Sequence, residues 1–246
     1  MRQNRQEILS TLLGILLIGC LIQAAGWLRG DSLVFPGVPE ILRAFFHLLA
    51  EARTWRLTAT TLAHLLQALA LSSLIGIPLG MAEGAAGFLY RLLRPLMIFL
   101  RSVPMIVMVI IIMVMTKYEH VPLAAATLLL IPLISEAVCE GMRRIEPELL
   151  DVYRLNSSFN LYVLLRVYLP LTAGYLKQAY ISAVGMGIRI VVSTEYLVQS
   201  KDSLGKAIYS SSYFNEYQDI YAYALIMILL VLLVGSLPVL LSGKRE

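Results

Sequence analysis

The chain has 246 residues, of which 59% are hydrophobic and 15% are charged, whereas soluble globular proteins average roughly 45–50% apolar and about 25% charged residues. This composition excludes an ordinary soluble enzyme and indicates a membrane protein, because several apolar runs approach the roughly 20 residues that span a bilayer. The net charge of +4 comes from basic residues that flank these runs, so it does not indicate nucleic-acid binding.

Apolar runs predict six transmembrane helices in one transmembrane domain that covers residues 1–246. Helices are expected because backbone groups in lipid must satisfy their own hydrogen bonds. The first run begins like a secretion signal, but apolar sequence continues through Trp27, so we expect it to be retained as a span. The fold class is therefore all-α and polytopic, with spans at about 8–28, 57–82, 95–116, 122–142, 174–198 and 219–241.

The distribution of Lys and Arg predicts the orientation, since cytoplasmic loops are enriched in both residues. With the N-terminus inside, eleven basic residues fall on the cytoplasmic side and seven on the other, and both termini are cytoplasmic. The cytoplasmic set is Arg2, Arg5, Arg91, Arg94, Arg143, Arg144, Arg154, Arg166, Lys177, Lys244 and Arg245, and the outer set is Arg29, Arg43, Arg53, Arg56, Lys117, Lys201 and Lys206.

Two outer segments contain features of their own. In residues 29–56, Pro39 opens a predicted short helix whose apolar face would lie along the membrane surface. In residues 199–219, Tyr209, Tyr213 and Tyr217 are four apart and would share one face of a helix. An interfacial aromatic belt explains these tyrosines, and a gate or docking surface is the alternative.

No catalytic or metal-binding motif is visible. The three histidines pair with no cysteine at ligand spacing, and Cys20 and Cys139 lie in apolar runs, so we expect neither a metal site nor a disulfide framework. The sequence contains no phosphate-binding loop and no nucleophile with its base, so we expect no catalytic residues in this chain.

Charged residues within the predicted spans need protein or water around them, because an unpaired charge at the bilayer centre costs at least about 2.5–3.5 kcal/mol. The candidates are Arg101, Arg189 and Glu195, and Glu136 and Glu140 mark the polar end of the fourth predicted span. Arg189 and Glu195 are six apart and project to different faces, so each is expected to pair with another helix. The alternative is that Arg101 or Arg189 lines a pathway and attracts an anion.

The polar stretch at residues 151–170 interrupts the apolar sequence. As a helix it would place Val152, Leu155 and Phe159 on one side and polar residues on the others. Together with its flanks it predicts a charged helical loop at about 143–173, which is longer than a plain connection requires. The apolar stripe suits a groove on a partner protein, and a helix on the bilayer surface is the alternative.

The order of residues in this loop resembles the "EAA" loop of bacterial ABC importer permeases. The family's usual Glu, two Ala and turn Gly are replaced here by Asp151, Val152, Tyr153 and Ser157, and the match continues at Val167, Leu169 and Pro170. Similarity extends over residues 33–240, where "VFPGVPEILRAF", "LIGIPLGMAEG", "RPLMIFLRSVP" and "EGMRRIEPELLDVYR" also resemble family segments. Together these segments resemble the nitrate, sulfonate, taurine and thiamine-precursor permeases.

The resemblance implies a type I ABC importer-like permease of the bacterial inner membrane that forms a translocation pathway. It implies two ATPase subunits that hold ATP and Mg²⁺, a second permease copy or related subunit, an external substrate-binding protein and surrounding lipid, with no cofactor on this chain. The cargo would be a small solute, with anions and vitamin precursors as candidates. The alternative is a self-contained carrier or channel driven by an ion gradient, although no internal repeat is visible.

Overall fold

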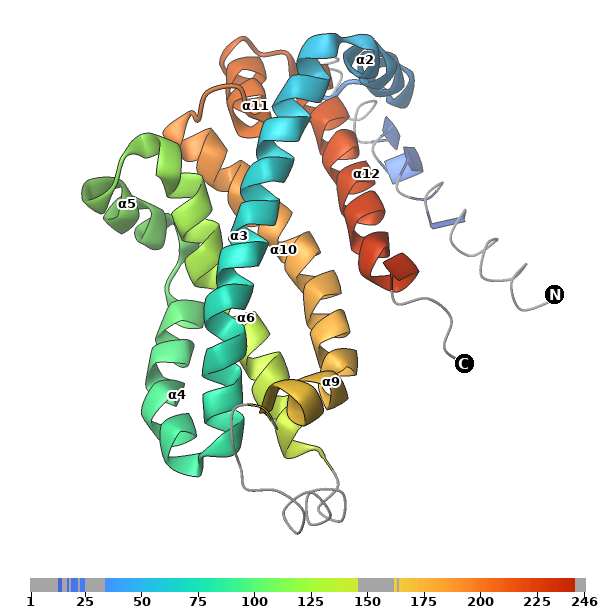
Figure 1. Ribbon diagram of the computed structural model, residues 1–246. Helices are drawn as coiled ribbons and strands as arrows, with labels where there is room; N and C mark the ends of the chain where they lie inside the picture. The colour runs from blue at the N-terminus through green and yellow to red at the C-terminus, as the bar shows by residue number, and fades with distance from the viewer. Residues whose placement is uncertain are drawn as a thin grey trace, which may run out of the picture.

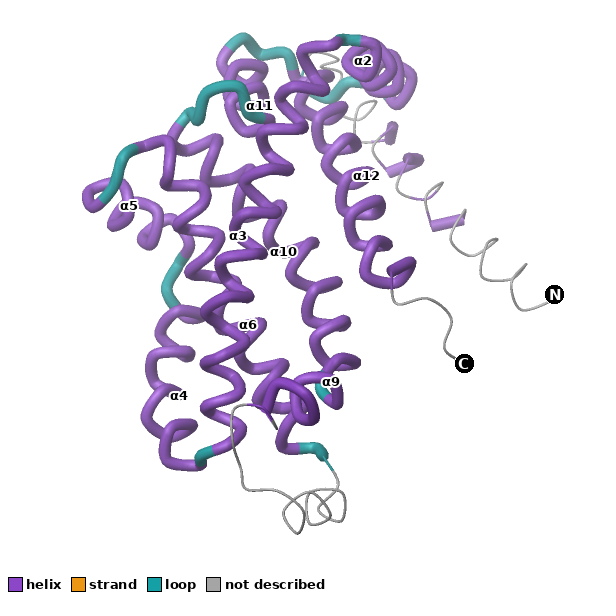
Figure 2. The backbone as a smooth tube through the Cα atoms, viewed as in Figure 1, coloured by secondary structure: helices purple, strands orange, loops and turns teal. Residues whose placement is uncertain are grey.

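The computed structural model describes residues 34–145 and 164–241, together with Tyr162 and eight residues between positions 13 and 24. Every regular element in this part of the chain is a helix, as Figure 2 shows, which confirms the predicted all-α class. The elements are α2 (Val38–Ala50), α3 (Ala52–Ala85), α4 (Gly87–Ser102), α5 (Met105–Met115), η1 (Tyr118–His120), α6 (Val121–Arg143), η2 (Leu164–Tyr168), α9 (Leu169–Leu171), α10 (Ala173–Val198), α11 (Leu204–Tyr213) and α12 (Tyr217–Leu241).

Four segments among the described residues are long and apolar enough to cross a membrane: α3, η1 with α6, α10 and α12. They match the predicted spans at 57–82, 122–142, 174–198 and 219–241, although α3 begins at Ala52 and ends at Ala85. The first predicted span, 8–28, lies mostly outside the described residues and stays a prediction.

The predicted span at 95–116 is not one straight helix. It consists of α4 and α5, which are bent by 100° at a short break. Pro104 follows this break, and Val103 has an extended backbone, with φ −67° and ψ 127°. Proline has no backbone N–H and disfavours a helical conformation at the preceding residue. The bent pair is therefore a broken span or a re-entrant segment, and α5 points away from the bundle in Figure 1.

Helices α3, α6 and α10 form the centre of the bundle (Figure 1), and fully buried Leu65, Leu130 and Ile134 lie between them. Close approach of α3 to α6 depends on Gly80. A Cβ atom at this position would clash with the Ser135 carbonyl oxygen and would lie 2.8 Å from Val138 Cβ. Small residues allow this kind of backbone approach in membrane helices, so α3 and α6 pack as a tight pair.

The bundle has two distinct ends. At one end, here called the coupling end, α3 and α6 finish and α4 and α10 begin; α2 and α11 cover the opposite end, as Figure 1 shows. Helix α2 has Pro39 in its first turn, as the sequence predicts. The Glu40 carboxylate accepts a hydrogen bond from the Gly37 N–H at 3.0 Å, which caps this helix. The buried side of α2 packs against α12.

The three outer tyrosines do not share one helix. Tyr213 ends α11 and Tyr217 begins α12, and Asn215 between them has φ 60°. Asparagine adopts this left-handed conformation more easily than most residues, so it permits the turn that separates the two helices. Tyr209 instead packs edge-to-face on Tyr196 of α10, with ring centroids 5.5 Å apart.

Candidate functional site

The exit of the predicted coupling loop is fixed to the coupling end of the bundle. Val167 and Leu169 pack against a buried cluster that contains Met81 of α3, Val138 and Met142 of α6, and Tyr168. Pro170 lies in the first turn of α9. The other predicted coupling residues, Asp151, Val152, Tyr153, Leu155, Ser157 and Phe159, lie outside the described residues. We call the cluster of Met81, Val138, Met142 and Tyr168 the joint cluster.

A second contact locks the start of α10 to the end of α6. A Cβ atom at Gly141 would lie 2.9 Å from Thr172 Cβ and 3.1 Å from Tyr175 Cδ2. The Thr172 hydroxyl is turned inward and donates a hydrogen bond to the Leu169 carbonyl at 2.8 Å. The segment before α10 therefore contacts α6 directly and shares the joint cluster with α3.

Arg101 and Glu136 form an ion pair between α4 and α6, and both side chains are about half exposed. Glu140 pairs along its own helix with Arg144 at 2.8 Å. The Glu140–Arg144 pair lies at the coupling end, where the sequence predicts a polar end of the fourth span, whereas Arg101 lies in the last turn of α4, away from that end. The contact between α6 and the broken span formed by α4 and α5 is therefore partly ionic.

Arg189 occupies a different position from Arg101. It is exposed and borders an apolar cleft of about 470 Å³ between α10 and α12, with Met227 and Val231 on the opposite wall. Within the described residues it takes part in no ion pair. The predicted pairing of Arg189 with another helix is therefore not seen in this part of the chain.

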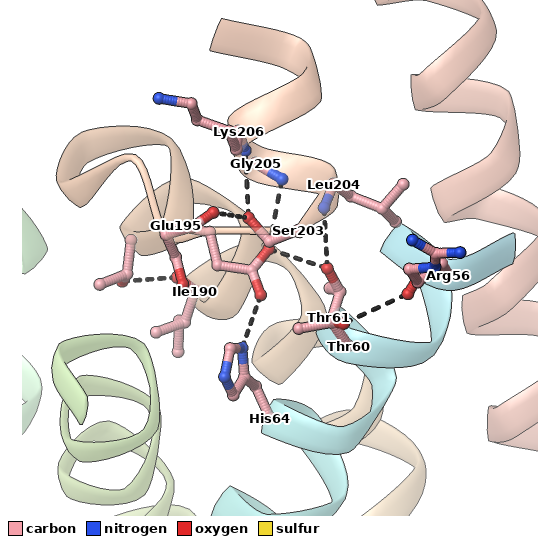
Figure 3. Close-up of polar contacts among 12 residues, drawn as sticks. Arg56, Thr60, Thr61, His64, Ile190, Glu195, Ser203, Leu204, Gly205 and Lys206 are labelled. Atoms are coloured by element: carbon pink, nitrogen blue, oxygen red, sulfur yellow. Dashed lines mark hydrogen bonds and ion pairs between the residues drawn. The ribbon is translucent and has the colours of Figure 1, made fainter. Parts of the chain in front are cut away.

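Glu195 is fully buried and connects three helices, as Figure 3 shows. Its Oε2 atom accepts hydrogen bonds from the Thr61 hydroxyl of α3 at 2.9 Å and from the Gly205 N–H of α11 at 3.2 Å. Its Oε1 atom lies 2.8 Å from His64 Nδ1, also on α3. The Leu204 N–H donates to Thr61 Oγ1 at 3.0 Å. Glu195 therefore pairs with other helices, as its spacing from Arg189 indicates.

A cavity of about 500 Å³ lies between α3, α4 and α6 towards the coupling end. Charged side chains surround it: Glu83, Arg94, Arg101, Glu136, Glu140 and Arg143. Glu83 is the buried member of this set, and it was missed by sequence reasoning because the predicted span ended at residue 82, which placed Glu83 in solvent. Its position in an apolar run only one residue beyond that end was the available signal.

No group of three side chains suited to a metal ion occurs among the residues that the structure describes. His64 is committed to Glu195, and Cys139 is buried beside the charged cavity. The described residues form a helical bundle with charged residues at helix contacts, a charged cavity and an apolar cleft.

These features define a multi-pass helical membrane protein. The fold is similar to a chain of the inward-facing MetNI methionine ABC transporter in its CY5 native crystal form, with TM-score 0.67, 18% identity, and coverage of 80% of this chain and 100% of that chain. Residues 72–243 match the model of the family described as binding-protein-dependent transport system inner membrane component. A comparison with curated proteins found no match.

The chain belongs to this family, because the match covers well over half of its length. It is an ABC importer permease with a type I importer fold. The resemblance seen in the sequence is confirmed at the level of the superfamily.

Proposed function

We propose that this chain forms the translocation pathway of an ATP-driven importer and is non-catalytic itself. The working unit would contain two permease subunits, either two copies of this chain or this chain with a related one, two ATPase subunits that hold ATP and Mg²⁺, and an external binding protein. The family match and the type I fold support this assembly. The cargo would be a small solute, with anions and vitamin precursors as candidates.

We further propose that residues 143–173 carry the motion of the ATPase to the spans. The joint cluster supports this proposal, because Val167 and Leu169 at the exit of the segment pack against it and it contains residues of both α3 and α6. Asp151, Val152, Tyr153, Leu155, Ser157 and Phe159 would contact the ATPase groove, and Val167, Leu169 and Pro170 would transmit its movement. A groove suits the apolar stripe of the predicted helix.

The proposed location is the bacterial inner membrane, with both termini and the coupling end in the cytoplasm. The excess of Lys and Arg near the span ends on that side supports this orientation.

Disruption of the coupling segment should abolish ATP hydrolysis by the complex. The tagged chain is purified in mild detergent, copurifying chains are identified, and ATPase activity is compared for the native segment and for a variant with Asp151→Arg and a proline inserted within 151–163. We expect copurified ATPase activity to fall to background, because a proline interrupts the helix and the reversed charge opposes docking. A chain that purifies alone without ATPase activity would contradict the importer assembly.

Neutralisation of Arg101 tests whether this residue acts on the cargo. Arg101→Gln should change the free energy of unfolding by no more than about 1 kcal/mol, because an exposed ion pair contributes little. Uptake by the reconstituted complex should fall several-fold, while affinity for the binding protein stays unchanged. Glu136→Gln is the matched control, since it breaks the same ion pair and retains the arginine. If both variants lose uptake equally, or if Arg101→Gln lowers affinity for the binding protein as much as it lowers uptake, the result would contradict a role of Arg101 in attracting the cargo.

A further inference from the structure

Glu83 is a buried carboxylate that lacks a full set of partners. It lies in the last turn of α3, and only 4% of its surface is exposed. Its Oε2 atom accepts a weak hydrogen bond from the Ser135 hydroxyl at 3.3 Å, whereas Oε1 has no hydrogen-bond partner in the described part of the molecule. A buried polar atom without a partner destabilises the fold, and more so when it is charged. Such an exception in a native fold requires a physical reason.

The surroundings of Glu83 cannot easily rearrange to supply that partner. Gly80 and Gly84, on the same helix, hold α3 against α6 so closely that a Cβ atom at either position would lie 2.8 Å from the nearest side-chain Cβ atom on α6. Helix α4 forms the third wall of the cavity, and no residue in it is buried. The Glu83 side chain therefore lies on a closely packed wall and lines the cavity, but its Oε1 atom is covered, so contact with a solute requires a rotation of this side chain.

Arginines also line this cavity, among them Arg94 and Arg143, while the other lining carboxylates, Glu136 and Glu140, are each paired with an arginine. The Arg143 guanidinium stacks on Tyr90 at 3.7 Å from the ring centroid, and Arg94 lies 5.6 Å from the same ring. Within the described residues, neither arginine forms an ion pair, whereas Arg101 is paired with Glu136. Stacked guanidinium groups retain N–H donors at their edges for a carboxylate, sulfonate or phosphate.

We propose that this cavity binds a small zwitterion, with an ammonium group on Glu83 and an acidic group at Arg94 and Arg143. A simple anion would leave the Glu83 Oε1 atom unpaired, and a simple cation would face two arginines. The volume of about 500 Å³ exceeds that of such a solute. Because Arg143 ends α6, the bound solute contacts the helix end that leads into the coupling segment. This inference rests on the proposed function and deepens it by naming the class of solute that the permease contacts.

Thiol labelling of the full-length chain in nanodiscs tests the site. In a Cys20→Ser, Cys139→Ser background, Ile98→Cys introduces a thiol into the cavity wall, where the native side chain is largely exposed. The probes are ω-amino acids from glycine to aminohexanoate, together with the alkylamine and alkanoate of each length. We expect at least one amino acid to slow labelling, and its matched amine and alkanoate to protect at least ten-fold more weakly.

Glu83→Gln should weaken that protection about ten-fold or more, which corresponds to about 1.4 kcal/mol. Glu140→Gln is the matched control, because it removes another carboxylate that lines the cavity and should retain protection. Glu83→Gln also removes an unpartnered charge, so its thermal stability should not fall, and a folding defect would be visible as a lower melting temperature.

Two outcomes would overturn the proposal. In the first, alkanoates protect the thiol as well as amino acids do, and Glu83→Gln does not change this protection. That result would mean that the arginines bind a simple anion. The second is the absence of protection by every probe at tens of millimolar, which would leave Arg143 as the internal partner of Glu83. Labelling needs no ATPase, so its result is independent of the copurification experiment that tests the importer assembly.

Discussion

Replacement of Glu195 by alanine should lower the free energy of unfolding by about 3–5 kcal/mol, because it removes a fully buried carboxylate from the contact between three helices. Thr61, His64 and the Gly205 N–H would all lose their acceptor. The melting temperature in mild detergent measures the loss. Hydrogen exchange at residues 204–213 should also accelerate, since α11 is held to α3 and α10 by these bonds.

Glu195→Gln is the control that separates hydrogen bonding from charge. The amide oxygen can still accept from Thr61 and Gly205, and the amide nitrogen can donate to His64 if Nδ1 is the acceptor. We therefore expect a loss of only about 1 kcal/mol. If both variants lose the same stability, the negative charge rather than the hydrogen-bond pattern holds α11 in place. An alanine variant as stable as the wild type would contradict the role of Glu195 altogether.

Composition and the lengths of apolar runs were sufficient to predict four of the spans, since burial in lipid imposes a simple requirement on sequence. The break at Pro104 was harder, because apolar residues continue on both sides of it and the run reads as one span. Proline favours a kink in a helix, but the angle of 100° between α4 and α5 cannot be derived from its presence alone. The position of a residue in an apolar run therefore predicts that the residue is helical, but it does not predict the direction of the helix.

Long-range polar contacts explain most of what the sequence could not predict at the candidate site. Glu195 and His64 are 131 residues apart, and the local sequence around either residue does not indicate the other as its partner. Glu83 was missed for a different reason. The predicted span ended at residue 82, three residues before the observed end of α3 at Ala85, so Glu83 fell outside the predicted span. The assignment of Val167, Leu169 and Pro170 to the coupling loop came from family resemblance rather than from periodicity, and their coupling role stays a prediction.

Gly80→Ala should destabilise the seam between α3 and α6 by about 1–3 kcal/mol, even though alanine is favoured over glycine in a helix by about 1 kcal/mol. The new methyl group would meet the Ser135 backbone and Val138 Cβ, and neither can move without shifting α6. Because Met81 and Val138 belong to the joint cluster, separation of the helices should also loosen the link between ATP hydrolysis and uptake. Melting temperature and the ratio of uptake to hydrolysis measure the two effects.

A series of three glycine-to-alanine variants tests whether the close packing of α3 against α6 causes this loss of stability. At Gly84, the new methyl group would lie 2.8 Å from Met142 Cβ and 2.9 Å from its Sδ, and of these two only the sulfur can move aside; because no backbone atom is among its nearest contacts, as it is at Gly80, Gly84→Ala should cost less than Gly80→Ala. At Gly174 no atom of the described residues, apart from its chain neighbours and its own helix backbone, lies within 4 Å of the added carbon, so Gly174→Ala should not destabilise the chain. Melting temperatures should therefore rise from Gly80→Ala through Gly84→Ala to Gly174→Ala. Equal values for the three variants would mean that α3 and α6 are not packed backbone to backbone, and the joint cluster could then not transmit force between them.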